Sequence, residues 1–252
     1  MNEEKHWDTI GKEYDSQIFD VFKSDRRKIL PQFFRKHAKK SGLAIDFGCG
    51  TGKSFEYLSP LFKNIIAVDI SNELLVQAKK RPFNNITFKQ ADLTKPGLNV
   101  SKADFAFCCN VAMLPEIKRT HAMIRNVQRS LKPGATALFV LPSLDSVFYA
   151  VWRLIEVYER EGIDIANIPE SEFDYLKADK RRLVEGIIYI DNVPTKHYMR
   201  PELDVVFSNA GFKLTAVEKV EYNWDTELSN PPRWLKDPYP WDWLVECKKI
   251  RK

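Results

Sequence analysis

A glycine-rich turn between an apolar segment and an amphipathic segment constrains this chain more than any other feature. The apolar segment Leu43–Phe47 carries one acidic residue, Asp46, and glycines follow at positions 48, 50 and 52 before the amphipathic segment Ser54–Phe62. This order is typical of a strand, a tight turn and a helix that opens against a bound ligand. Glycine permits the sharp turn and lets backbone N–H groups approach the ligand. A dinucleotide fingerprint would have its third glycine one position later, where Lys53 stands, so a nicotinamide site is disfavoured.

Length and composition suit one large domain with room for an insertion. The chain has 252 residues, of which 44% are hydrophobic and 29% charged, as in ordinary globular proteins. It has no apolar run long enough to span a bilayer, and residues 1–6 show no secretory segment. The four cysteines lack C-x-x-C spacing, which argues against a disulfide or zinc framework. We therefore expect a cytoplasmic protein in a reducing compartment.

The net charge of +5 is mild and is spread over short basic clusters such as Arg26-Arg27-Lys28 and Lys180-Arg181-Arg182. Such clusters are typical of solvated helix faces and helix ends. A nucleic-acid footprint would require the clusters to share one face of the folded protein. We therefore do not expect a nucleic-acid partner.

Short apolar runs alternate with helical segments between residues 43 and 141. This alternation predicts parallel strands joined by right-handed crossovers, which form an α/β doubly wound sheet with helices on both faces. The predicted strands are 43–47, 65–69, 86–90, 103–108 and 135–141, and the predicted helices are 54–62, 72–81 and 116–131.

The alternation breaks after residue 142. Residues 143–200 contain a helical stretch at 145–160, an acidic and aromatic loop, and a hairpin whose turn we place at Asn192-Val193-Pro194. A helix at 201–210 and two last strands, at 212–222 and 243–248, would complete a sheet of seven strands.

Three acidic residues stand where predicted strands end: Asp46, Asp69 and Asp92. Ligands of doubly wound sheets bind outside the carboxyl ends of the strands, so these side chains should meet at one edge. A carboxylate at Asp69 could accept both hydroxyls of a ribose, and Asp92 could accept from an adenine amino group. Each residue could instead cap the helix that follows it, but three such residues in register favour a nucleoside-containing ligand.

The run Ile45-Asp46-Phe47-Gly48-Cys49-Gly50-Thr51-Gly52 resembles motif I of the class I S-adenosylmethionine-dependent methyltransferases. The resemblance extends from about residue 40 to 141, includes the turn Leu131–Ala135, and resumes near Gly211. It implies a seven-stranded Rossmann-like methyltransferase sheet with a lid insertion after the fifth strand. It also implies S-adenosyl-L-methionine as cofactor and S-adenosyl-L-homocysteine as product.

The resemblance implies roles for the matching positions. Asp46 and the glycine turn would hold the methionine part, Asp69 the ribose diol, and the pair Asp92-Leu93 the adenine edge. The N-terminal stretch from His6 to Asp15 resembles a cofactor-covering helix of the small-molecule branch, in which Tyr14 would reach the methionine carboxylate. The implied cofactor-binding residues are Tyr14, Asp46, Gly48, Cys49, Gly50, Gly52, Asp69, Ile70, Asp92, Leu93 and Asn110.

Methyl transfer from a sulfonium is an in-line displacement whose donor is already activated, so the protein mainly supplies proximity and alignment. A general base is needed only where the acceptor must lose a proton. The candidate catalytic residues are His197 and Tyr198, although His197 could equally be a packing residue of the hairpin. Carboxylates do not cluster at the predicted ends of the fourth and fifth strands, so we predict that no metal is needed.

These observations predict a single methyltransferase domain over residues 1–252, with cofactor-covering helices over 1–40 and a substrate lid over 143–200. The predicted reaction is proximity-driven, metal-independent methyl transfer to a small organic acceptor, by a monomer or homodimer without membrane partners. An RNA or protein methyltransferase and a non-catalytic S-adenosylmethionine-binding module remain the alternatives.

Overall fold

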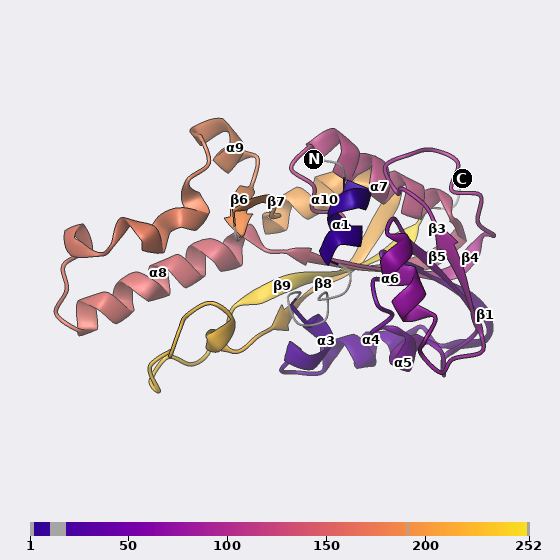
Figure 1. The fold of residues 1–252 in the computed structure, drawn as a ribbon, viewed down its shortest axis with the longest axis horizontal. Helices are drawn as coiled ribbons and strands as arrows, with labels where there is room; N and C mark the ends of the chain where they lie inside the picture. Colours follow the sequence, from indigo (N-terminus) through magenta and orange to yellow (C-terminus); the bar gives the residue numbers. More distant parts are fainter. Residues whose placement is uncertain (1–2, 11–18, 191, 251–252) are drawn as a thin grey trace.

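A seven-stranded sheet forms the centre of the computed structural model, which describes residues 3–10, 19–190 and 192–250 (Figure 1). The strand order is β3-β2-β1-β4-β5-β9-β8. The strands are β1 (Lys39–Phe47), β2 (Phe62–Asp69), β3 (Ile86–Gln90), β4 (Ala103–Cys109), β5 (Leu131–Pro142), β8 (Phe212–Glu221) and β9 (Trp241–Lys249).

The first five strands are parallel, and β9 runs antiparallel between β5 and β8. The chain passes from β1 to β2 on one side and returns to β4 on the other, so the topological switch point lies between β1 and β4. In this register Asp46 of β1 faces Ala67 and Phe107 on its two neighbours. The predicted doubly wound sheet of seven strands is confirmed, although β1 and β5 begin about four residues earlier than predicted.

Helices cover both faces of the sheet. Side chains of α7 (Ile117–Arg129) and α10 (Arg200–Asn209) pack with Ile45 and Phe47 on one face. Side chains of α4 (Ile29–Lys36) and α5 (Phe55–Leu58) pack with Ala44 and with Phe105 and Phe107 of β4 on the other. Because successive residues of a strand point to opposite faces, the apolar run of β1 fills both layers. The remaining helices of this part are α1 (Glu3–Ile10), α3 (Val21–Ser24) and α6 (Asn72–Ala78).

The segment after β5 projects beyond the sheet (Figure 1). It begins with α8 (Leu144–Arg160), whose first turn is capped by the Ser143 side chain. It continues through η2 (Ile165–Asn167), η3 (Glu170–Leu176), α9 (Lys180–Val184) and the hairpin strands β6 (Ile187–Ile190) and β7 (Val193–Lys196).

The predicted hairpin is present, but its predicted turn is wrong. Val193 and Pro194 lie in β7, paired with Ile190 and Tyr189. A two-stranded hairpin consists only of edge strands, so proline is tolerated there. The tighter turn leaves Asn192 in the left-handed region, with φ of 65°.

The loop between β8 and β9 extends beside α8, on the same side of the molecule (Figure 1). Ala150 of α8 packs against Trp224 of η4 (Trp224–Thr226) and against Leu235, all three of them buried. The Tyr149 hydroxyl donates to the Pro238 carbonyl at 3.1 Å. These contacts join two segments that are far apart in sequence into one layer at the carboxyl end of β5. None of the described helices combines the length and the hydropathy that a bilayer span requires.

Candidate active site

The glycine turn after β1 is built from left-handed backbone. Gly48, Gly50 and Gly52 have φ values of 68°, 52° and 80°, which glycine adopts without strain. The N–H groups of Gly48 and Cys49 both donate to the Val68 carbonyl, at 2.7 and 3.1 Å, and so tie the turn to β2. A Cβ at Gly48 would lie 2.2 Å from Val111 Cγ2, so no larger residue fits there.

Two predicted carboxylates lie at this turn. Asp46 is buried and accepts a hydrogen bond from the Ser54 hydroxyl, and burial raises its pKa to about 7. Asp69 is 6% exposed, and its oxygens accept from the N–H groups of Gly50 at 2.8 Å and Ser71 at 3.0 Å. Each Asp69 oxygen keeps the capacity for one more hydrogen bond. The side chain therefore both braces the turn and can accept from a ligand hydroxyl.

The residues after β3 that were predicted to bind the adenine edge make other contacts in the structure. Asp92 Oδ1 accepts from the backbone N–H and the hydroxyl of Thr94, at 2.8 and 2.6 Å, and so closes its own turn. The Leu93 side chain lies in the core rather than at a ligand surface, while Ile70 is partly exposed. These placements leave one carboxylate oxygen of Asp92 and the backbone as the groups that could reach an adenine edge.

Helix α1 lies against α6, beside the carboxyl ends of β2 and β3 (Figure 1). Asp8 accepts from the Ser71 hydroxyl and from the Glu73 N–H. Gln90, at the end of β3, donates to both Glu4 and the Ile70 carbonyl. The first predicted covering helix thus lies next to the strand ends for which ribose and adenine binding is predicted, whereas Tyr14 lies outside the described residues.

Asn110 follows β4 at the switch point. Its φ of 51° is left-handed, and its backbone N–H donates to the Val140 carbonyl at 3.0 Å. Asn110 Nδ2 donates to Asp242 at 3.4 Å, while the buried Oδ1 atom has no hydrogen-bond partner among the described residues. A buried, unpaired amide oxygen is costly unless a ligand satisfies it.

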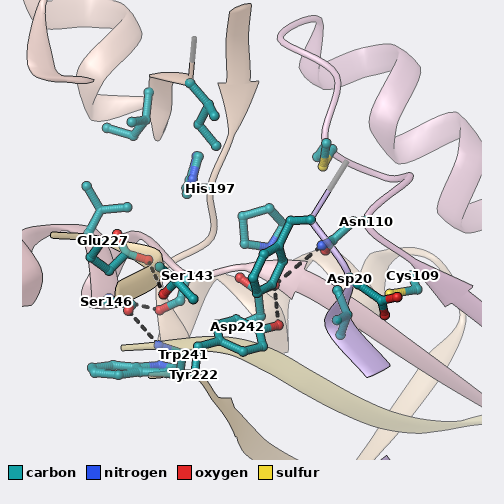
Figure 2. Close-up of a pocket in the computed structure, with 18 of the residues that line it drawn as sticks. Asp20, Cys109, Asn110, Ser143, Ser146, His197, Tyr222, Glu227, Trp241 and Asp242 are labelled. Atoms are coloured by element: carbon teal, nitrogen blue, oxygen red, sulfur yellow. Dashed lines mark hydrogen bonds between the residues drawn. The ribbon is translucent and has the colours of Figure 1, made fainter. Parts of the chain in front are cut away.

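A cavity of about 610 Å³ runs from the glycine turn to the segments beyond β5 (Figure 2). Gly48 and Cys49 of the turn line it, as do His197 and Glu227, and the hydrogen-bonded pair Asn110 and Asp242 lies on its wall as well. Side chains of α8 and β6 supply apolar walls: Val147, Ala150, Val151, Leu154, Ile188 and Ile190. The volume lies within the usual range of small-ligand pockets. The cavity therefore joins the predicted cofactor turn to a second, largely apolar compartment.

His197 enters this cavity from the hairpin side (Figure 2). Its side chain is 4% exposed, and its Nδ1 lies 3.0 Å from the Thr195 carbonyl, which can only accept. In the neutral ring, Nδ1 is therefore the donor and Nε2 is an unprotonated acceptor. Burial lowers the pKa of His197 to about 4, so the ring is neutral at physiological pH.

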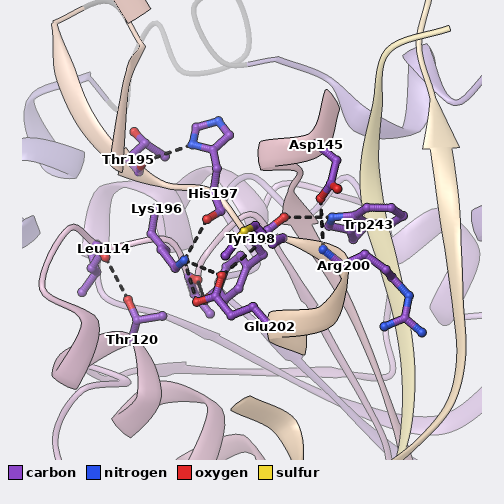
Figure 3. Close-up of polar contacts among 12 residues, drawn as sticks. Leu114, Thr120, Asp145, Thr195, Lys196, His197, Tyr198, Arg200, Glu202 and Trp243 are labelled. Carbon is purple, nitrogen blue, oxygen red and sulfur yellow. Dashed lines mark hydrogen bonds and ion pairs between the residues drawn. The ribbon is translucent and has the colours of Figure 1, made fainter. Parts of the chain in front are cut away.

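Polar contacts around His197 fix its position (Figure 3). The buried Lys196 ammonium pairs with Glu202 at 2.7 Å and donates to the His197 carbonyl at 2.8 Å. The next residue, Tyr198, joins the end of β5 because its N–H donates to the Pro142 carbonyl and its carbonyl accepts from Leu144. The histidine is thus held where β5 ends, far in sequence from the glycine turn.

The structure does not bring Tyr198 into the cavity. Its ring is fully buried in the core, and its hydroxyl donates to the Ala112 carbonyl at 2.6 Å. Side chains of neighbouring extended residues point in opposite directions, so His197 and Tyr198 cannot both face the same space. The placement assigns Tyr198 a packing role in place of the predicted catalytic one.

Two carboxylates of the cavity were missed by sequence reasoning. Asp242, on β9, accepts from the Tyr222 hydroxyl at 2.8 Å, and burial raises its pKa to about 6. Glu227, in the loop after β8, lines the cavity and is exposed, and partial desolvation together with the Asp242 charge raises its pKa. Both residues lie in an aromatic-rich tail without a motif, so the sequence carried no local signal for them.

No group of three or more His, Cys, Asp or Glu side chains within residues 3–10, 19–190 and 192–250 could hold a metal ion. Metal independence of the reaction stays a prediction. The cysteines are free, and burial raises the pKa of the Cys49 thiol well above its usual range. A protonated thiol is a poor nucleophile, so Cys49 is suited only to fill space in the turn.

The turn fits S-adenosylmethionine in its chemistry. Gly48 lines the cavity at the turn, and the Asp69 carboxylate beside it, held by the Gly50 and Ser71 N–H groups, is an acceptor suited to ribose hydroxyls. When bound, S-adenosylmethionine would supply an activated methyl group at the boundary of the two compartments.

Comparison with known proteins agrees with this assignment. Residues 44–134 match the family model described as "Methyltransferase domain". A Streptomyces venezuelae enzyme, dTDP-3-amino-3,4,6-trideoxy-alpha-D-glucopyranose N,N-dimethyltransferase, is 21% identical over 218 residues, which cover 82% of this chain and 87% of that protein.

Solved structures show the same fold. An S-adenosylmethionine-dependent methyltransferase from Methanosarcina mazei superposes with a TM-score of 0.62 at 18% identity, over 87% of this chain and 98% of that one. DhpI in a complex with SAM and HEP superposes with a TM-score of 0.60 at 17% identity, over 97% and 94% of the two chains. Together, the sequence match over residues 44–134 and the shared fold show a methyltransferase domain of the S-adenosylmethionine-dependent kind, with S-adenosylmethionine as its cofactor.

Proposed function

We propose that this enzyme transfers the methyl group of S-adenosylmethionine to a small organic molecule bound in the compartment between α8, the β6–β7 hairpin and the β8–β9 loop. The observation that carries this proposal is the continuity of the 610 Å³ cavity, which joins the glycine turn to a recess with largely apolar walls. An RNA or a folded protein would need a broad, flat surface, whereas a concave, mostly apolar recess suits a small molecule. The Streptomyces relative, which is named for an amino-sugar substrate, supports the same class of acceptor.

In this proposal the glycine turn and Asp46 hold the methionine part, and Asp69 holds the ribose. Residues 143–200 act as the substrate lid, and α1 covers the cofactor as the first of the N-terminal helices. The main contribution of the protein to the rate is alignment, because the donor is already activated. The reaction needs no metal.

His197 is the residue that we propose to orient the acceptor. Its Nε2 faces the cavity and has no hydrogen-bond partner among the described residues, so it can accept from a ligand donor. Its pKa of about 4 makes it a weak base at neutral pH. We therefore assign it hydrogen bonding to the acceptor rather than removal of a proton.

The test is methyl transfer from radiolabelled S-adenosylmethionine to three substrates: a desalted metabolite extract, total RNA and total protein. We expect label only in the metabolite fraction, and its loss with Asp69→Ala. Label in RNA or protein would overturn the small-molecule proposal. Tight binding of S-adenosylmethionine without label in any fraction would instead indicate a non-catalytic binding module.

A further inference from the structure

Two carboxyl groups of the acceptor compartment have no cationic partner among the described residues. Glu227 and Asp242 both line it, and neither forms an ion pair within residues 3–10, 19–190 and 192–250. Lys53, a basic residue at the cofactor end, is paired with Asp20 at 3.1 Å. His197 is neutral, so it does not supply the missing positive charge.

A polar atom on the wall of the same compartment also lacks a partner. His197, 4% exposed, lines the cavity, and its Nε2 has no hydrogen-bond partner in the described part of the chain. A buried polar group without a partner carries a desolvation cost that a complementary ligand removes. The compartment is therefore a site built for a polar group and not only an apolar space.

From these contacts we infer that the methyl acceptor is an amine, and that its nitrogen binds between Glu227 and Asp242 next to Asn110. This inference rests on the proposed function. A cationic ammonium would offset one negative charge and could donate to both carboxylates, whereas a neutral alcohol would offset no charge. A carboxylic acid or a phosphate would add a third negative charge to the same space.

The position of Asp242 links this site to the reacting groups. Asp242 accepts from Asn110, the residue at the switch point, and from Tyr222, so its carboxylate lies at the boundary between the two compartments. Glu227 lies on the loop after β8, which borders the acceptor side (Figure 2). We assign Asp242 to holding the nitrogen and Glu227 to taking its proton.

The step balances in atoms and charge. The ammonium first transfers one proton to Glu227 and becomes a neutral amine with a free lone pair. That lone pair forms the new N–C bond to the methyl carbon, the C–S bond breaks, and its electron pair stays on sulfur. A carboxyl group with a raised pKa suits this proton transfer, and the pKa of Glu227 lies above its ordinary value.

The experiment is a calorimetric titration of the full-length protein, saturated with S-adenosylhomocysteine, with benzylamine and with its neutral counterpart benzyl alcohol. The variants are Glu227→Gln and Asp242→Asn, which keep shape and remove charge. Asp225→Asn is the matched control, because Asp225 is exposed on the same loop and does not line the cavity. Thermal melting of each variant checks that it folds.

We expect benzylamine to bind at least about tenfold more tightly than benzyl alcohol, since one charge-assisted hydrogen bond accounts for roughly that factor. The preference should disappear in Glu227→Gln and Asp242→Asn and persist in Asp225→Asn. Equal affinities in the wild type, absence of benzylamine binding, or a preference that survives in Glu227→Gln would overturn the amine assignment.

The two proposals fail in different ways. If S-adenosylhomocysteine does not bind when the protein is saturated with it before the amine titration, both the proposed function and the amine site are refuted. Normal binding of S-adenosylhomocysteine, followed by labelled methyl transfer to an alcohol or an acid of the metabolite extract, would keep the methyltransferase function and remove only the amine site.

Discussion

The two halves of the candidate site are built in opposite ways. In the cofactor half, residues 43–141, each predicted residue lies at or just after the carboxyl end of a strand, and the contacts that shape the site are made between adjacent strand ends, as between Gly50 and Asp69. In the acceptor half, residues 143–243, the functional side chains of His197, Glu227 and Asp242 come from three segments with no motif in common. The difference shows that one half is specified by local turn geometry and the other by packing of distant segments.

The largest effect should come from Asp69→Ala, which tests the cofactor half alone. Loss of the carboxylate removes its hydrogen bonds to ribose and to the Gly50 N–H, so S-adenosylmethionine binding should weaken by about 2–4 kcal/mol. Calorimetry measures the affinity. Asp225→Asn, in the acceptor half, should bind the cofactor as the wild type does. If Asp69→Ala and the wild type bind S-adenosylmethionine with equal affinity, Asp69 does not contact the cofactor.

A matched pair of glycine substitutions separates backbone strain from steric clash across the two halves. Gly48 and Gly162 both have positive φ, of 68° and 80°, but a Cβ at Gly48 meets Val111 while a Cβ at Gly162 meets nothing within 4 Å. Gly162→Ala should lower the free energy of unfolding by about 1 kcal/mol, through strain. Gly48→Ala should lower it by about 2–3 kcal/mol, because overpacking adds to strain. If denaturant titration shows that Gly48→Ala and Gly162→Ala lose the same free energy of unfolding, a steric clash at Gly48 is refuted.

The pH dependence of stability tests the burial of His197 in the acceptor half. Its pKa is about 4 in the folded protein and 6.5 when unperturbed, so below pH 6.5 only the unfolded chain gains a proton. The folded state therefore loses stability as the pH falls from 6.5 toward 4. Between pH 7 and pH 5 the wild type should lose about 2 kcal/mol more than His197→Gln. Denaturant unfolding at both pH values measures this difference, and parallel losses would show that His197 is solvated.

The smallest effect should come from Tyr198→Phe, beside His197. The variant loses the hydrogen bond to the Ala112 carbonyl and should lower the free energy of unfolding by about 1 kcal/mol. Its methyl-transfer rate should stay within about twofold of the wild type, because the ring packs in the core. A large loss of rate in a variant of normal stability would restore a catalytic role for Tyr198.

The residues of the cofactor half were predictable because they belong to short motifs at the ends of predicted strands. Asp46, the three glycines and Asp69 were identified from spacing and from the family resemblance, and the structure brings them together at one turn. Helix and strand ends were less accurate: the predicted helix 54–62 is only Phe55–Leu58, since the chain turns early into β2 at Phe62. Asp92 and Leu93 show that a correct position in sequence does not settle whether a side chain faces a ligand or the core.

The sequence by itself determined the doubly wound sheet, its seven strands, the glycine turn and the cofactor that this turn serves. Alternation of apolar runs and turns acts over a few residues, so it can be read without knowledge of the rest of the chain. Only the tertiary structure decided which residues line the cavity beyond the glycine turn, because β9 inserts antiparallel between β5 and β8 and carries Asp242 to the end of β5. The same packing places His197 in the cavity and Tyr198 in the core. Contacts between segments so distant in sequence depend on the assembly of the whole sheet, because β9 must pair with β5 and with β8 at once.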